Sequence, residues 1–377
     1  MALLRSAVIL IASAMAAGSA SAQMSLVPPA ADPPAQAAPA TPTQPGRPKA
    51  EARPMPKAEP KVKRPEVIKG PAPSAPAGTE AAGSNDLDAV LNEAPNVDLV
   101  YGAYQRGMYR TAFNLAMKRA TEKNDTAAMT MLGELYANGQ GVKRDYVKAS
   151  EWYKRAADGG DREAMFALAM LQIGGQGGVP DRQDGARLLA SAAKLGEPKA
   201  AYNLALLYMD GQTLPQDFKR AAELLRLAAD AGNDDAQYAL ANFYKEGTGV
   251  GKDIDKSVRL LQAAALAGNL AAQVEYAIAL FNGTGTTKNE AAAISLLRKA
   301  ARRNNPIAQN RLARVLVLGL GGTPIDQIEG LKWHVVAKTS GKGDTLLDEA
   351  MGRLSAEDRA KVERAAAKWL GVPPPSP

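Results

Sequence analysis

The side chains that most often carry catalysis or hold metal ions are scarce in this chain of 377 residues. It has no cysteine and one histidine, His334. This composition argues against disulfides, thiol nucleophiles, Ser-His-Asp triads and zinc sites built on cysteine and histidine. We therefore expect no metal and no cofactor.

Paired carboxylates are the remaining candidates for acid–base chemistry. They occur at Asp234-Asp235 and Asp348-Glu349. Adjacent side chains on a helix diverge, so neither pair can flank one scissile bond. The Gly-x-Gly at Gly139 and Gly141 follows no strand, so it is not a phosphate cradle. We expect no catalytic residue and no enzyme activity.

A repeat with a period of 36 residues runs through the chain instead. Its alanines are Ala128, Ala164, Ala200, Ala236, Ala272 and Ala308. Its glycines are Gly139, Gly175, Gly211, Gly247, Gly283 and Gly319. A fixed period of this length is typical of an array of small helical units.

Each unit is predicted to be a helix pair. In the first unit, Asp125 caps helix one, Gly139 ends it, and Asp145 caps helix two. A small residue recurs in helix one and lets a neighbouring helix approach closely, at Gly133, Ala169, Ala205, Ala241, Ala277 and Ala313. The expected core column of helix two is Trp152, Leu188, Leu224, Leu260 and Leu296. His334 falls one position after that column and is expected to pack there in place of a tyrosine.

The string Leu132-Gly133-x-x-Tyr136-x-x-Gly139-x-Gly141-Val142-x-x-Asp145, continued by Trp152-Tyr153 and Ala156-Ala157, resembles the Sel1-like repeat, a relative of the tetratricopeptide repeat. The resemblance implies an all-α fold. It would be an α-solenoid, a right-handed superhelix of about six 36-residue helix-turn-helix repeats over residues 126–341. Members of the family act as adaptors, and exported bacterial members serve envelope signalling, surface-polymer regulation or host contact.

The flanking segments depart from the period. We expect residues 96–125 to form an N-terminal capping helix pair. Residues 342–377 are expected to contain a C-terminal capping helix, which starts at Ser355, and a disordered proline tail. Such caps cover the apolar ends of a repeat array.

The first 22 residues have the features of a secretory signal peptide, with cleavage after Ala22. Residues 23–95 are expected to be a disordered linker rich in proline and alanine. Its most basic part, residues 57–65, is either plain linker or a spacer that touches anionic cell-wall polymers. We expect a periplasmic or secreted chain without a transmembrane segment in its mature form. The formal charge of +7 is dispersed, so nucleic acid is not an expected partner.

One further pattern could form a partner-binding site. Three columns of helix one, which start at positions 130, 134 and 137 in the first unit, are apolar in several later units. The candidate contacts are Phe166, Met170, Ile173, Tyr202, Leu206, Met209, Tyr238 and Phe281. These residues either form a groove for a protein or peptide, or are buried on both sides.

The sequence thus predicts an exported, non-catalytic scaffold or regulator that binds a protein or peptide in a concave groove, in an envelope process. Two alternatives remain. One is an enzyme of the β-lactamase or cell-wall hydrolase type, and the other is a secreted factor that contacts a host.

Overall fold

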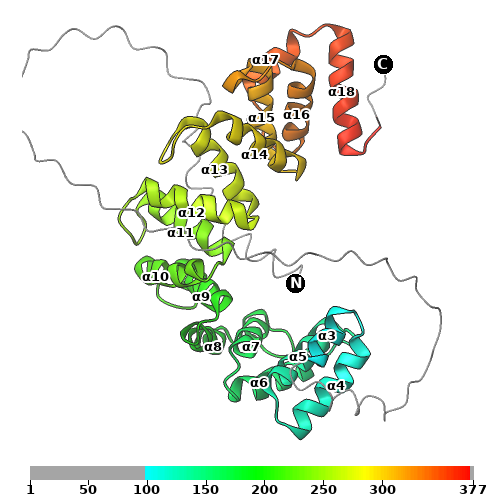
Figure 1. Ribbon diagram of the computed structural model, residues 1–377, viewed down its shortest axis with the longest axis vertical. Coiled ribbons are helices and arrows are strands. Elements are labelled where there is room, and N and C mark those ends of the chain that lie inside the picture. Colours follow the sequence, from blue (N-terminus) through cyan, green and yellow to red (C-terminus); the bar gives the residue numbers. More distant parts are fainter. Residues whose placement is uncertain (1–97, 374–377) are drawn as a thin grey trace, which may run out of the picture. The chain divides into compact units, whose positions relative to one another are not determined.

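The computed structural model describes residues 98–373, which are helical throughout and contain no strand (Figure 1). The helices before the repeats are α3 (Leu99–Gln105) and α4 (Tyr109–Glu122). The repeat helices are α5 (Thr126–Asn138), α6 (Tyr146–Asp158), α7 (Arg162–Gly174), α8 (Arg182–Lys194), α9 (Pro198–Asp210), α10 (Phe218–Asp230), α11 (Asp234–Glu246), α12 (Ile254–Ala267), α13 (Leu270–Asn282), α14 (Glu290–Arg302), α15 (Pro306–Leu318) and α16 (Gln327–Thr339). The 3-10 helix η1 (Leu320–Gly322) precedes α16, and α17 (Thr345–Gly352) and α18 (Ala356–Leu370) follow it. The predicted signal peptide (1–22) and linker (23–95) lie outside the described residues.

The helices from α5 to α16 form six pairs in chain order. Within each pair the two helices pack on each other, and the second helix also packs on the first helix of the next pair. The pair α3 and α4 joins this series through contacts of α4 with α5. The predicted all-α solenoid of about six helix pairs is therefore confirmed.

Helix ends follow the repeat. Asp125 and Asp145 each accept a backbone hydrogen bond in the first turn of their helix, at 3.2 and 3.0 Å. The residue two positions after helix two needs a positive φ, as at Gly160 (φ 88°). Where the glycine is missing, asparagine takes its place, at Asn124 (φ 51°) and Asn304 (φ 61°). Asparagine tolerates this left-handed conformation better than most side chains do.

The most buried column of helix two lies one residue after the predicted one. Trp152 and Leu188 are half-buried, whereas Tyr153 and Leu189 are buried against helix one. The whole buried column is Tyr153, Leu189, Leu225, Leu261 and Leu297. The prediction that the Trp152 column forms the helix-two core was therefore wrong by one position. One residue turns a side chain by about 100° around the helix, so the earlier column stays at the edge of the core.

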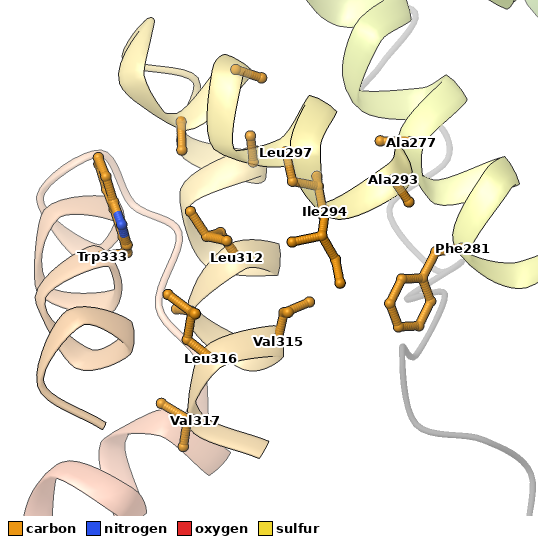
Figure 2. Close-up of a cluster of buried hydrophobic side chains, with 14 of the residues drawn as sticks. Ala277, Phe281, Ala293, Ile294, Leu297, Leu312, Val315, Leu316, Val317 and Trp333 are labelled. Carbon is orange, nitrogen blue, oxygen red and sulfur yellow. The ribbon is translucent and has the colours of Figure 1, made fainter. Parts of the chain in front are cut away.

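Figure 2 shows how three consecutive helices share one core. Leu312 and Leu316 of α15 lie between Leu297 of α14 and Trp333 of α16. The side chains belong to two different units, so each unit completes the core of its neighbour. A single unit would therefore leave part of its apolar face exposed to water.

A glutamine joins consecutive units in the later part of the array. The side-chain amide of Gln273 donates to the carbonyl of Ala265, in the last turn of the preceding helix, at 3.0 Å. Gln237 and Gln309 make the same hydrogen bond with their own neighbours, at 3.1 and 3.2 Å. In the earlier units the same position holds Met129, Met165 and Ala201.

Two helices, rather than the single predicted one, follow the last unit. Leu347 of α17 and Val362 of α18 are fully buried in the same core cluster as Trp333. Helix α18 starts at the expected Ser355 cap, whereas α17 has only eight residues and gave no clear periodic signal. Within residues 98–373, none of the helices combines the length and the apolar character that a membrane crossing requires.

Candidate partner-binding face

The candidate contacts lie on helix one of units two to five. We call the side chains in the columns of positions 130, 134 and 137 the helix-one face. The structure places its eight predicted contacts at different depths. Leu206, Met209 and Phe281 are only 6–7% exposed and belong to the core. The half-buried members are Phe166, Met170, Ile173, Tyr202 and Tyr238.

The apolar side chains in the column of position 137 lie toward helix two of their own unit, and three of them, Met209, Phe281 and Val317, are buried. Ile173 lies so close to Gly185 on α8 that a Cβ there would be 2.5 Å from the Ile173 Cγ1. Val317 packs in the same way against Gly330 on α16, where the corresponding distance is 2.7 Å. Phe281 belongs to the core cluster that also holds Ala293 of its own helix two. This column therefore serves packing within the unit.

In the column of position 130, Phe166, Tyr202 and Tyr238 stay partly accessible, whereas Val274 is buried. Phe166 and Tyr202 pack partly on the core cluster of units two to four and keep part of their rings exposed. Burial raises the pKa of Tyr202 to about 12, and the negative charges of Asp235 and Asp234 add to this. The hydroxyl is thus harder to ionise than that of an exposed tyrosine.

Tyr238 belongs to a polar cluster between units four and five. Its hydroxyl donates to Oε1 of Glu275 at 2.7 Å, and Lys245 binds the other oxygen of this carboxylate at 3.0 Å. Burial and the Glu275 charge raise the pKa of Tyr238 well above its ordinary value. Both partners of Glu275 come from the preceding unit, so the carboxylate ties two units together.

A similar contact joins the N-terminal pair to the first unit. The Tyr104 hydroxyl donates to Oε1 of Glu134 at 2.9 Å. Burial and the Glu134 carboxylate raise the pKa of Tyr104 to about 12. Glu134 belongs to the same column of the face as Met170 and Leu206, so the face carries a carboxylate at its start and apolar groups further on.

The face ends in a second ionic cluster. Arg314 donates through Nε to Oδ2 of Asp344 at 2.5 Å, and Asn310 donates to the same oxygen at 3.2 Å. The side chain of Asp344 is only 3% exposed. Arg314 is largely enclosed by this ion pair, with 20% of its side chain exposed. It therefore fastens α15 to the start of α17.

Arg311 lies beside this cluster, one turn before Arg314. Its side chain is half-buried, and its Nε has no hydrogen-bond partner. Glu275 and Arg311 occupy the same repeat position, which holds Met131, Ala167, Asn203 and Ala239 in the earlier units. Charges that appear only in the last two units of an otherwise uncharged column are a sequence signal for these contacts.

His334 packs in the core, as predicted, with 1% of its surface exposed. It also has a partner that the sequence did not reveal. Its Nε2 lies 3.0 Å from Oδ1 of Asp348, which Lys338 binds at 2.6 Å. Asp348 is thus engaged in holding α17 against α16, while its neighbour Glu349 pairs with Arg353. The adjacent carboxylates Asp348 and Glu349 therefore bind different partners.

Comparison with known proteins identifies the type of repeat. The family model described as Sel1 repeat matches six consecutive segments: 126–161, 162–197, 198–233, 234–269, 270–305 and 306–337. No curated protein matches the chain.

Solved structures that share the fold include two repeat proteins. One is a protective antigen present in uropathogenic Escherichia coli strains that displays an SLR fold, with a TM-score of 0.64 and 26% identity. The match covers 75% of this chain and 63% of the antigen, so the chain spans less than two thirds of that protein. The other is a Sel1 repeat protein from Oxalobacter formigenes, with a TM-score of 0.58 and 30% identity. That match covers 65% of this chain and the whole of the other.

Proposed function

Because the chain belongs to the Sel1 repeat family, whose members are generally protein-interaction scaffolds, we propose that it is an exported, non-catalytic scaffold. It binds a protein or peptide along the helix-one face of units two to four. Through this contact it regulates or assembles an envelope process such as signalling or surface-polymer control.

The observation that carries this proposal is the series of half-buried rings on consecutive units. Phe166, Tyr202 and Tyr238 occupy one repeat position in units two, three and four. A ring that is partly covered is held in place and still offers an apolar edge. Aromatic anchors of this kind often contribute about 2 kcal/mol or more each at protein interfaces.

The Tyr202 hydroxyl adds a polar group to these rings, whereas the Tyr238 hydroxyl already donates to Glu275. The Tyr202 hydroxyl is protonated at neutral pH, as any tyrosine is, so it can donate to a carbonyl of a bound peptide. An extended segment placed across these helices would then meet the Phe166 ring and the Tyr202 hydroxyl on consecutive units. Leu206 and Met209 belong to the core cluster on which Phe166 and Tyr202 pack, so they support these two rings. Phe281 belongs to a separate core cluster.

Export is part of the proposal and is supported by the sequence of residues 1–22. A periplasmic location would place the scaffold beside envelope proteins. The basic residues 57–65 would then lie where they can touch anionic cell-wall polymers, which would hold the scaffold near the wall.

Site-specific photocrosslinking in cells tests the binding face without removing core atoms. A photoreactive phenylalanine analogue replaces Tyr202 or Phe166, and in control variants it replaces the exposed Leu227 or Leu266 of helix two. We expect one discrete protein adduct from both helix-one positions and none from the controls. Adducts that arise only from the helix-two positions would move the binding site to the other face.

The likeness to the protective antigen favours a second candidate, a secreted factor that contacts a host surface. Fractionation of cells and medium separates the two candidates. A scaffold of the periplasm stays with the periplasmic fraction, whereas a host-contact factor reaches the medium or the outer surface of the cell.

A further inference from the structure

A hollow of about 540 Å³ lies between α4 and α6, where the N-terminal helix pair meets the first unit. The buried side chains of Ala120 and Met129 and the half-buried ring of Trp152 form its apolar part. Small-molecule sites in proteins have volumes of about 300–1,000 Å³ and combine an apolar lining with a few polar groups. None of the residues that line this hollow belongs to the helix-one face, so a ligand bound here would leave that face free.

The repeat does not account for Trp152, because its position holds leucine in units two to five. Nε1 of Trp333 donates to Glu329 at 2.8 Å. Nε1 of Trp369 likewise donates to Asn304, at 3.3 Å. Nε1 of Trp152 has no hydrogen-bond partner among residues 98–373. A buried tryptophan N–H usually finds a partner, so Trp152 brings both a flat ring and an unused donor to the hollow.

Three polar side chains of the hollow, those of Asn124, Arg155 and Asp158, form no hydrogen bond or ion pair within the described part of the chain. Arg155 and Asp158 are one helical turn apart on α6, yet they do not pair with each other. The guanidinium of Arg155 lies over the Trp152 ring instead, with Cζ 4.8 Å from the ring centroid. The hollow therefore holds one positive and one negative charge. This balance favours a neutral ligand with many polar groups over an anion or a cation.

We propose that this hollow binds a sugar ring of a neutral glycan chain. A pyranose ring has an apolar C–H face, which packs on an aromatic side chain, and a rim of hydroxyls, each of which donates and accepts hydrogen bonds. Trp152 supplies the aromatic surface. Arg155 and the amide of Asn124 donate and Asp158 accepts, so neighbouring hydroxyls find both kinds of partner. An extended peptide lacks this combination of an apolar ring face and adjacent hydroxyls.

Titration of the chain of residues 23–377 with neutral tetrasaccharides gives the first test. The probes are cellotetraose, chitotetraose and maltotetraose, which differ in linkage or in the substituent at C2. Calorimetry measures the affinity, and saturation-transfer NMR shows which ring protons touch the protein. We expect at least one probe to bind, with the C–H protons of one ring face saturated most strongly. Failure of all these probes to bind would overturn the proposal.

Variants of the hollow give the second test. Trp152→Leu introduces the residue that units two to five carry, and it should weaken the bound tetrasaccharide by about tenfold or more. The matched control Tyr101→Leu removes an exposed ring of α3 outside the hollow and should leave the affinity unchanged. If Trp152→Leu lowers Tm, Asp158→Asn decides instead, because this exposed carboxylate contributes little to the fold and its loss should still weaken binding. Unchanged affinity in the hollow variants, or an equal loss in Tyr101→Leu, would reject the site.

Two further probes test the class of ligand. Tetragalacturonate adds carboxylates to the sugar rings, and hexaproline presents a peptide with apolar rings and no hydroxyls. Tighter binding of tetragalacturonate than of every neutral tetrasaccharide would make the hollow an anion site. Binding of hexaproline that Trp152→Leu abolishes would make it a peptide site. Either result overturns the proposal of a neutral glycan, and photocrosslinking at Tyr202 still tests the helix-one face independently.

Discussion

The ring of Tyr153 occupies the space that a side chain at Gly133 would need. A Cβ at position 133 would lie 2.5 Å from both Cδ1 and Cε1 of the ring. In the other units, alanine stands at the repeat position of Gly133. A side chain smaller than tyrosine stands at the repeat position of Tyr153. Ala169 with Leu189 is one such pair. The sizes of the two positions are therefore matched within each unit.

This match predicts opposite effects of one substitution in two backgrounds. In the natural protein, Gly133→Ala overpacks the contact, which costs about 1–3 kcal/mol and outweighs the gain in helix propensity of about 1 kcal/mol. In a Tyr153→Leu background the clash is gone, so the same change should stabilise. Denaturant unfolding of the four proteins measures both effects. Additive effects of the two changes would mean that the positions do not interact.

The ion pair of Asp344 predicts a pH-dependent stability. Burial alone would raise the pKa of Asp344, but hydrogen bonds from Arg314 and Asn310 hold it below its ordinary value. A depressed folded-state pKa stabilises the fold above the unfolded value of about 3.9, and this contribution is lost as the pH falls through the folded value.

Asp344→Asn should therefore cost about 3–5 kcal/mol at pH 7, because it leaves Arg314 without its buried partner. The difference from the natural protein should shrink as the pH drops below about 4. Thermal unfolding of both proteins between pH 3 and pH 7 measures it. A difference that stays constant over this range would show that the carboxylate charge contributes nothing.

Removal of residues 342–377 should expose the end of the array. Leu347 and Val362 cover a core that includes Leu331 and Trp333, so truncation returns these side chains to water. We expect aggregation at concentrations where the full chain stays monodisperse, as light scattering can detect. A matched truncation after Gly371 leaves both helices in place and should behave like the natural protein. A well-dispersed shorter chain would mean that α17 and α18 are not required as a cap.

Export predicts a mature chain that starts at Gln23. Mass spectrometry of protein purified from its native host should give the mass of residues 23–377. Ala22→Leu places a large side chain where the signal peptidase accepts small ones, and it should leave the precursor uncleaved. Recovery of the natural chain with Met1 present would contradict the prediction.

The period of 36 residues was enough to predict the helix pairs and their order, because caps, glycines and small residues recur in every unit. It could not rank two adjacent apolar columns, since Trp152 and Tyr153 both fit a core position. Nor could it show that Ile173 points at Gly185 rather than outwards. Tertiary packing decides such orientations. The partners of Glu275 and Asp344 were also hidden, because they lie about 30 residues away and in different units.

The glutamines that bridge consecutive units at the repeat position of Gln273 occur in the second half of the array and not in the first half. The hydrogen bond from Gln273 to Ala265 has a fixed length and direction, so it resists sliding of one helix pair past the next. Where Met129, Met165 and Ala201 stand instead, the same contact is apolar and without a preferred direction. At this contact we therefore expect bending and stretching to meet less resistance in the first half of the solenoid than in the second.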